Sequence, residues 1–243
     1  MSVKLIDLSH TVEHGMITYK GLPAPVISDH LSREQSKALY EPGTQFQIGR
    51  IEMVANTGTY LDSPFHRYAN GADLSELPLE SLANLEGIVM RHVGTDERTL
   101  EQAAFPNIGI VPGDSIPARG RAILPDEVGH HDVRGKAVLF HTGWDMRWRT
   151  DDYANGKHPF LSAAAAGLLA DAGATLVGID SYNIDDTSSG SRPAHSILLA
   201  RGIPIVEHLC GLRELPKVGF RFFAVPVKVK GFGTFPVRAF AMV

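Results

Sequence analysis

The chain has 243 residues, of which 44% are hydrophobic and 21% charged, which is ordinary for a soluble globular protein. A formal net charge of -4 provides no basic surface for nucleic acid, and the single Cys210 excludes an intramolecular disulfide framework or a multi-cysteine zinc site. No segment approaches the roughly 18 consecutive apolar residues of a membrane span, and the first residues contain no apolar signal segment. We therefore expect a cytoplasmic protein with neither a nucleic-acid nor a membrane partner.

The first third of the chain is predicted to contain two strands around a long irregular segment. Apolar residues in Val3–Leu8 indicate an opening strand. Residues 20–45 are rich in chain breakers, so we expect an excursion with one helical turn near Ser32–Leu39. Weak alternation across Phe46–Val54 predicts a strand, and the leucine-rich run Leu74–Leu85 predicts one or two short helices.

The rest of the chain predicts alternating strands and helices. Ser162 is a predicted N-cap and Gly173 a predicted C-terminal stop for the clearest helix, Ala163–Ala172. The other predicted elements are strands at Gly87–His92, Ala137–His141, Thr175–Ile179, Ile203–Val206, Ala224–Val229 and Val237–Val243, and a helix at Ala194–Ala200. No repeat or linker divides the sequence, so we expect residues 1–243 to form a single α/β domain with a mixed β-sheet flanked by helices.

The stretch from Asn56 to His66 (Asn-Thr-Gly-Thr-Tyr-Leu-Asp-Ser-Pro-Phe-His) contains an unusual density of reactive side chains. It combines the Asp62 carboxylate, the His66 imidazole, the Tyr60 phenol and the Asn56 amide. Apolar residues are too sparse for a core helix, and Pro64 argues against a central strand. We interpret the stretch as a loop that presents catalytic groups; the alternative is an ordinary surface loop.

His195 and Glu207 are predicted to be close neighbours. A helix of about seven residues after His195 travels ~10 Å, and a returning strand of about four residues covers ~13 Å before Glu207. The two lengths nearly cancel, so both side chains return to one end of the sheet, where α/β proteins bind ligands. The pair is either half of a metal site or a base with its orienting partner; the alternative is a structural hydrogen bond.

Asp180, Asp185 and Asp186 place three carboxylates within seven residues. Such charges repel one another unless a positive group compensates them. Arg192 and a bound cation are the two candidates for this group. The alternative is a solvated turn whose aspartates cap the helix that begins near His195.

Together, these segments resemble the cyclase-like metal hydrolases, a family that includes bacterial kynurenine formamidase and isatin hydrolase. The family fingerprint His-x-Gly-Thr-His-x-Asp-x-Pro-x-His aligns with Asn56–His66. The resemblance extends over nearly the whole chain and implies a swivelling β/β/α type of α/β fold. The other similar segments are Ile6–Thr11, His141–Trp144, Gly178–Asp186, Pro193–His195, Gly202–Glu207 and Pro236–Ala239.

The resemblance implies one divalent metal ion, zinc or manganese, held by Asp62, His195 and Glu207, with His66 as the general acid/base. Two fingerprint histidines that bind metal in the family are here Asn56 and Tyr60. An amide oxygen is a weak ligand, and a phenol must first lose a proton of pKa ~10. One histidine and two carboxylates still form a three-ligand set. The alternative that the protein binds no metal also stays open.

From these observations we expect a metal-dependent hydrolase of a small aromatic amide. The first candidate is an aryl formamidase of tryptophan catabolism that converts N-formylkynurenine to kynurenine and formate. In this hypothesis Tyr60 or Asn56 donates to the developing oxyanion. Three aromatic residues would hold the substrate ring, unless they belong to the core: Tyr19, Phe65 and Trp144.

Two alternatives remain open from the sequence. One is a hydrolase of a cyclic imide or a lactone with the same fold, and the other is a metal-free small-molecule binding protein that has lost catalysis. The Asn56 and Tyr60 replacements favour the binding protein. The combined presence of four residues favours an enzyme, namely Asp62, His66, His195 and Glu207. The resemblance also implies a homo-oligomer, most simply a dimer.

Overall fold

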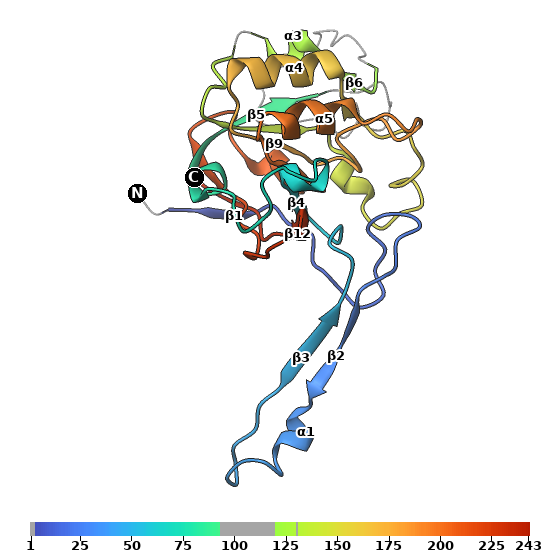
Figure 1. The fold of residues 1–243 in the computed structure, drawn as a ribbon, viewed down its shortest axis with the longest axis vertical. Helices are drawn as coiled ribbons and strands as arrows, with labels where there is room; N and C mark the ends of the chain where they lie inside the picture. The colour runs from blue at the N-terminus through green and yellow to red at the C-terminus, as the bar shows by residue number, and fades with distance from the viewer. Residues whose placement is uncertain (1–2, 93–119, 130) are drawn as a thin grey trace.

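The computed structural model describes residues 3–92, 120–129 and 131–243. Its centre is a mixed nine-stranded sheet that curls strongly toward its β4 and β12 edge (Figure 1). In spatial order the strands are β1 (Leu5–Asp7), β13 (Phe240–Met242), β11 (Phe220–Phe223), β5 (Leu85–Arg91), β7 (Ala137–His141), β9 (Leu176–Ile179), β10 (Ile205–Glu207), β4 (Tyr60–Asp62) and β12 (Thr234–Pro236). The predicted α/β fold with a mixed sheet is confirmed.

The four central strands, β5, β7, β9 and β10, run parallel, and the flanking strands run antiparallel. β7 is buried along its whole length, as its unbroken apolar run predicts. Val138 and Phe140 face one hydrophobic core, whereas Leu139 faces the other, because successive side chains of a strand point to opposite faces. The sheet therefore separates two cores.

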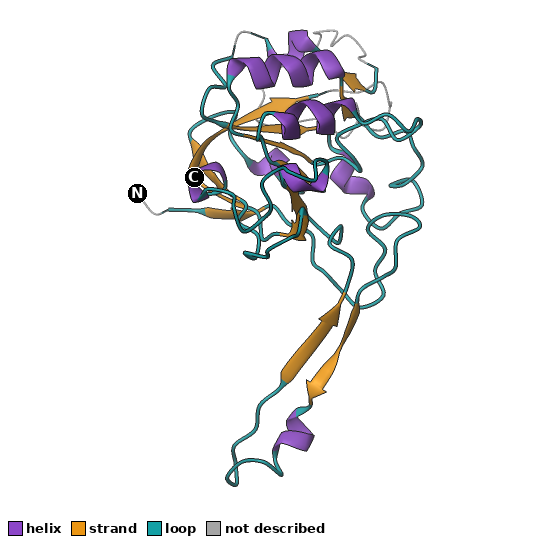
Figure 2. Cartoon of the chain, in the orientation of Figure 1, coloured by secondary structure: helices purple, strands orange, loops and turns teal. Residues whose placement is uncertain are grey.

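Helices α4 (Ala163–Ala172) and α5 (Pro193–Ala200) cover the first core side by side (Figure 2). α4 begins where the Ser162 hydroxyl accepts a hydrogen bond from the Ala165 N–H, and it ends at Gly173, whose φ of 83° suits glycine. Both predicted signals are confirmed. The short elements are α3 (Pro125–Val128), β6 (Ala122–Ile123), β8 (Phe160–Leu161), and the 3-10 helices η1 (Pro64–His66), η2 (Leu79–Ser81), η3 (Trp144–Arg147) and η4 (Leu212–Glu214).

A two-stranded ribbon projects away from the body of the molecule (Figures 1 and 2). It consists of β2 (Val26–Leu31) and β3 (Ile48–Glu52), with the single-turn helix α1 (Arg33–Ser36) near its tip. The predicted helical turn and the second strand are confirmed. β2 was not predicted, because the segment was expected to be irregular and its side chains are mostly exposed on both faces, which removes the alternating pattern.

The strand predicted at Val237–Val243 is confirmed by β13, whereas the strands before it lie at other residues than predicted. The strand expected at Ala224–Val229 is instead β11, Phe220–Phe223, whose Phe220 and Phe222 side chains are buried in the second core. Residues 234–236, expected to be part of a loop, form β12, an edge strand, where a proline is tolerated. Within the described ranges, no helix is long and apolar enough to cross a membrane.

Candidate active site

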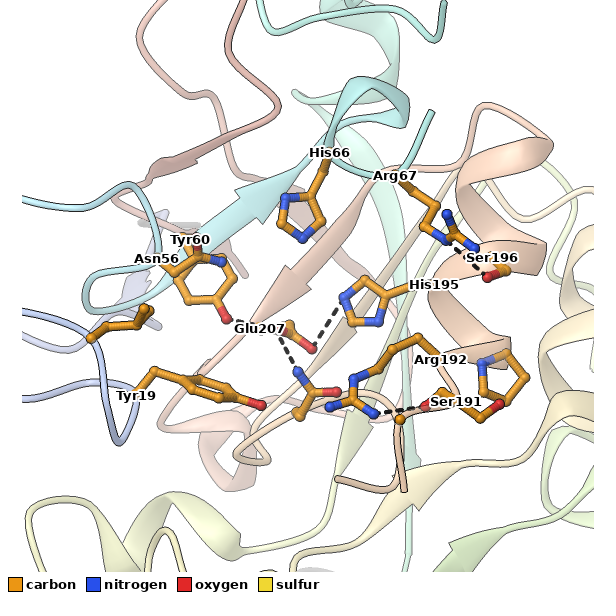
Figure 3. Close-up of a pocket in the computed structure, with 14 residues that line it drawn as sticks. Tyr19, Asn56, Tyr60, His66, Arg67, Ser191, Arg192, His195, Ser196 and Glu207 are labelled. Atoms are coloured by element: carbon orange, nitrogen blue, oxygen red, sulfur yellow. Dashed lines mark hydrogen bonds and ion pairs between the residues drawn. The ribbon is translucent and has the colours of Figure 1, made fainter. Parts of the chain in front are cut away.

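Three segments that are distant in sequence bring a histidine and two carboxylates together beside the paired strands β4 and β10. β10 ends at Glu207, which pairs in antiparallel register with Tyr60, while Asp62 lies two residues further along β4. Side chains alternate along a strand, so Tyr60, Asp62 and Glu207 share one face of the sheet. His195 approaches that face from the first turn of α5 (Figure 3).

The distances among these groups are too long for hydrogen bonds. His195 Nε2 lies 3.6 Å from Asp62 Oδ2 and 3.7 Å from Glu207 Oε1. The predicted proximity of His195 and Glu207 is therefore confirmed. Asp62 Oδ2 is buried, and it has no hydrogen-bond partner among the described residues.

These separations fit a small divalent cation between the groups. Two ligands at ~2.05 Å from a tetrahedral ion are separated by about 3.4 Å, close to the observed spacings. A buried carboxylate oxygen without a partner is costly unless a cation or another donor completes it. The separation of Asp62 from His195 thus fits two ligands of one metal ion. Asp62, His195 and Glu207 together, however, are not a group whose ligand atoms all lie within 4.8 Å of one another, so their predicted ligand roles stay a proposal.

His195 is held in position by Asp185. The Asp185 Oδ2 atom lies 2.7 Å from His195 Nδ1, and the same carboxylate accepts hydrogen bonds from the backbone N–H groups of Ala194 and His195. Asp185 therefore caps α5, as one sequence interpretation suggested, and also aims His195 Nε2 at Asp62. A carboxylate on the second nitrogen is the usual partner of a metal-binding histidine.

The His195 ring is the positive centre of the site when no metal is bound. Burial alone would lower the pKa of His195, but the hydrogen bond to Asp185 and the nearby Asp62 and Glu207 carboxylates outweigh it and raise the pKa to about 10. Burial also raises the pKa of Glu207 to about 7. A cation at this place, either a proton on His195 or a metal ion, is thus required by the surrounding carboxylates.

His66 is oriented by a residue of the C-terminal tail. Its Nδ1 atom lies 2.8 Å from the Thr234 hydroxyl, which in turn donates to Asp62 Oδ1. Because the hydroxyl has one hydrogen, the neutral His66 ring donates from Nδ1 and keeps Nε2 as a base. Gly233 makes this contact possible, since a Cβ atom there would lie 2.5 Å from the His66 Cα atom.

Asp62, His66 and His195 also form a possible ligand set of their own. One ligand atom from each of the three side chains lies within 4.8 Å of the other two. This set differs from the predicted one, because His66 takes the place of Glu207. The structure therefore leaves two candidates for the third protein ligand, and they can be separated by mutation.

Tyr60 and Asn56, which occupy the two fingerprint histidine positions, both line the cavity beside Glu207. The Tyr60 hydroxyl donates to Glu207 Oε2 at 2.7 Å. Burial and the Glu207 charge raise the pKa of Tyr60 well above its usual value. Tyr60 is consequently a neutral donor whose hydrogen is committed to Glu207, so it is available neither as a metal ligand nor as the oxyanion donor that we predicted.

A buried hydrogen-bond chain extends from Glu207 through Tyr60. His208 Nε2 lies 3.3 Å from the Tyr60 hydroxyl, and His208 Nδ1 lies 2.7 Å from the Tyr153 hydroxyl. Burial lowers the pKa of His208 to about 3, so the ring is neutral. The directions follow: Tyr153 donates to His208, His208 to Tyr60, and Tyr60 to Glu207. Sequence reasoning missed this chain, because nothing in the pattern joins Tyr153 to the end of β10.

An open cavity of about 670 Å³ lies above these groups, within the size range of small-molecule sites. Figure 3 shows His66, His195 and Glu207 around its base, with Tyr19 on one wall. The lining residues are Tyr19, Leu22, Asn56, Tyr60, His66, Arg67, Asn183, Gly190, Ser191, Arg192, Pro193, His195, Ser196 and Glu207. The sequence analysis did not name Arg67, and it named Arg192 only as a partner for the aspartates, since an arginine at a cavity wall carries no distinguishing pattern.

Of the three aromatic residues predicted to hold a substrate ring, only Tyr19 lines this cavity. Phe65 is absent from the lining, and Trp144 is buried in a cluster with Tyr153 and Tyr182. The Trp144 indole N–H donates to the Tyr153 carbonyl oxygen. For Trp144 the structure therefore agrees with the alternative interpretation, a core residue.

A second cluster, His141, Asp145 and Asp180, also has metal-like spacing. Here, however, the Arg91 guanidinium lies 2.9 Å from His141 Nδ1 and can only donate to it. The neutral His141 ring must then hold its hydrogen on Nε2, the nitrogen nearest Asp180. A metal ion there would have to displace this hydrogen. The cluster instead anchors the turn after β7, where Asp180 accepts from the Thr142 N–H and hydroxyl.

Asp186 is compensated by a different arginine from the predicted one. Its carboxylate lies 3.3 Å from Arg121 Nη2, whereas Arg192 contacts only the Asp186 carbonyl oxygen. Arg121 could not be anticipated, because it is 65 residues away in the chain. Arg192 is thereby left beside the cavity.

Comparison with known proteins identifies the family. The family model described as "Putative cyclase" matches residues 6–186 of this chain. The chain therefore belongs to the putative cyclase family, and the predicted resemblance is confirmed.

Curated relatives cover nearly the full length. The chain is 25% identical to a kynurenine formamidase from Salinibacter ruber over 97% of this chain and 95% of the relative. It is 26% identical to a kynurenine formamidase from Paracidovorax citrulli, over 97% and 94% of the two chains.

Solved structures share the fold. Isatin hydrolase A from Labrenzia aggregata, bound to benzyl benzoate, superposes with a TM-score of 0.75 at 21% identity and covers 99% of this chain and 94% of that one. A structure titled a potential metal-dependent hydrolase with cyclase activity has a TM-score of 0.72 at 24% identity, over 99% and 98%.

Proposed function

We propose that the chain is a metal-dependent amidohydrolase of the cyclase family that cleaves a small aryl formamide, with N-formylkynurenine as the first candidate substrate and kynurenine and formate as products. One observation carries this proposal: the buried Asp62 Oδ2 atom, which has no hydrogen-bond partner among the described residues, lies 3.6 Å from Nε2 of His195, a residue that lines a cavity of substrate size. Kynurenine formamidases that match the chain over nearly its full length support the choice of reaction.

Asp62 and His195 would hold the ion, with Glu207 or His66 as the third protein ligand. When bound, a divalent ion such as zinc or manganese supplies an activated water and polarises the scissile carbonyl. Asp185 fixes the His195 ring for this role, and the hydrogen bond from Tyr60 fixes the Glu207 carboxylate.

His66 performs the proton transfer in this proposal. Its Nε2 atom accepts a proton from the water that attacks the formyl carbon, and it returns the proton to the leaving amine nitrogen as the C–N bond breaks. Asn56 lines the cavity and offers its amide N–H to the carbonyl oxygen. Tyr19, which stacks on Tyr182 with ring centroids 4.5 Å apart, provides a rigid face for the aryl ring.

The test combines metal analysis with turnover. Protein purified without chelator is expected to contain about one equivalent of zinc or manganese and to hydrolyse N-formylkynurenine, followed by absorbance. His195→Ala should lose both metal and activity. His66→Ala should keep the metal and lose activity by roughly 10²–10⁴-fold, whereas His30→Ala, on the exposed ribbon, should change neither.

The outcomes separate the remaining alternatives. Loss of metal in His66→Ala, but not in Glu207→Gln, would assign His66 as a ligand in place of Glu207. A metal-loaded protein that cleaves a cyclic imide or lactone but not the formamide would change the proposed substrate, while the assignment as a metal-dependent hydrolase would remain. Protein that stays metal-free at saturating supply would favour a binding protein, in which protonated His195 serves as the cation.

A further inference from the structure

Two arginines line the cavity on either side of His195, and the proposed chemistry does not use them. Figure 3 shows Arg67 and Arg192 flanking the His195 ring, opposite the wall formed by Asn56 and Tyr60. Arg67 directly follows His66 in the chain, and Arg192 directly precedes α5. Both guanidinium groups thus belong to the segments that position the candidate catalytic residues.

Arg192 is fixed by main-chain carbonyl groups. Its Nη1 atom donates to the carbonyl oxygens of Ser189 and Ser191 at 2.7 Å each and to that of Asp186 at 3.3 Å. These contacts occupy one edge of the planar group. A guanidinium has five N–H donors, so Arg192 retains donors for a ligand while its position is already set.

Arg67 lies nearer the rim and is held more lightly. Its Nε atom lies 3.3 Å from the Ser196 hydroxyl, and the guanidinium carbon lies 5.4 Å from the centre of the Tyr68 ring. Its side chain is exposed. Among the residues that the structure describes, no carboxylate lies within ion-pair distance of Arg67 or Arg192.

The charges around the cavity indicate what the guanidinium groups of Arg67 and Arg192 could bind. The carboxylates beside it, Asp62 and Glu207, both face His195. A divalent ion on those carboxylates would balance them, which leaves both guanidinium charges uncompensated inside a concave, partly water-shielded site. Such a surface attracts anions, and a planar guanidinium binds a carboxylate through two parallel hydrogen bonds.

We propose that Arg192, assisted by Arg67 at the rim, binds a carboxylate carried by the substrate and so selects anionic aryl formamides over neutral ones. This inference rests on the proposed function. It assigns Arg192 and Arg67 as specificity-determining residues, with the formamide group directed to Asp62 and His195 and the carboxylate to the α5 side of the cavity.

The experiment compares N-formylkynurenine with its methyl ester, which lacks the carboxylate charge. Wild-type protein should show a higher kcat/KM for the acid than for the ester. Arg192→Gln should lower kcat/KM for the acid by roughly 10–100-fold, mostly through KM, and change the ester by less than about threefold. Arg67→Gln should act in the same direction with a smaller effect, and Arg192→Lys should recover part of the loss.

Arg201→Gln is the matched control. Arg201 lies at the other end of α5, where it pairs with Asp171 on the surface, so its removal changes the net charge equally without touching the cavity. Its acid-to-ester ratio should equal that of the wild type. A merely structural role for Arg192, as a clamp on residues 189–191, would lower turnover of acid and ester alike, and this result would overturn the proposal.

Binding of the product separates this inference from the reaction itself. Calorimetric titration with kynurenine and kynurenine methyl ester needs no turnover. One result would support the anion site and contradict the proposed reaction. In it, the protein hydrolyses neither formamide but binds kynurenine at least tenfold more tightly than its methyl ester, and Arg192→Gln removes this difference. Turnover or binding with no preference for the acid in the wild type rejects the anion site and leaves the proposed reaction intact.

Discussion

At the scale of single residues, Tyr60 is the junction of the buried polar network. It donates to Glu207 and accepts from His208, and it replaces a fingerprint histidine without leaving an unpaired group behind. A phenol can do this because it is both donor and acceptor, whereas its burial keeps it un-ionised. The replacement therefore converts a potential ligand position into support for Glu207.

Removal of the Tyr60 hydroxyl tests this role. Tyr60→Phe should lower the free energy of unfolding by about 1–3 kcal/mol, because buried polar atoms of Glu207 and His208 lose a partner. Turnover should fall as well, since Glu207 Oε2 loses its shorter hydrogen bond, although the Ile184 N–H still donates to Oε1. Tyr68→Phe is the control, as its hydroxyl donates to the Ser196 carbonyl oxygen of α5 and, among the described residues, bonds no group of the Glu207 network. Urea unfolding that shows equal effects for the two variants would contradict a special role for Tyr60.

The sequence predicted part of the site, and the division between found and missed residues has a physical reason. The proximity of His195 and Glu207 could be predicted from local geometry, because a helix and the strand after it nearly cancel in length. The position of Thr234 could not, since the contacts that place it depend on long-range packing. Thr234 meets Asp62 across 172 residues.

At the scale of elements, the same distinction separates β7 from β2. β7 is buried on both faces, so its continuous apolar run predicts a strand without knowledge of the neighbouring strands. The strands of the ribbon form one thin layer, and exposure on both faces removes the periodic signal. β11 was misplaced by a few residues, because the apolar run Ala224–Val229 looked more strand-like than Phe220–Phe223.

The ribbon leads to a prediction about assembly. An isolated two-stranded ribbon is at best marginally stable in water, yet this one exposes Ile51 by 57%, Ile48 by 48% and Phe46 by 54%. We infer that a second copy of the chain covers it, because a two-fold dimer would pair the same apolar surface from each copy. The predicted dimer would thereby protect both ribbons.

Light scattering coupled to size-exclusion chromatography measures the mass of the assembly directly. The protein should elute as a species of about 53 kDa, twice the 26.4 kDa chain. Ile51→Lys, which places a charge beside its cross-strand partner Ile27, should shift the mass toward the monomer. Leu79→Lys is the control, since Leu79 is 63% exposed on the body. A wild-type mass near that of one chain at micromolar concentration would rule out the dimer.

At the scale of the whole molecule, buried histidines link stability to pH. Burial, with the neighbouring Arg91 and Arg213 charges, lowers the pKa of His141 to about 3. Burial and the Arg149 charge likewise lower the pKa of His10 to about 4. Both rings stay neutral in the folded chain at pH values where an unfolded histidine, with a pKa near 6.5, takes up a proton.

The sign of the effect follows from proton binding. Between pH 6.5 and the lowered pKa values the unfolded chain binds more protons, so the contribution of each ring is complete above pH 6.5 and is lost as the pH falls. Each ring should lower the free energy of unfolding by about 1.4 kcal/mol for every pH unit that the pH falls within that window.

The variant His141→Asn tests this effect, because it keeps an acceptor for Arg91 and removes the titrating ring. Urea unfolding at pH 7.5, 6.0 and 5.0 should therefore show a shallower pH dependence than the wild type, by about that slope, whereas His30→Asn on the exposed ribbon should follow the wild type. Parallel curves for wild type and His141→Asn would mean that His141 is protonated in the folded chain, next to the Arg91 guanidinium.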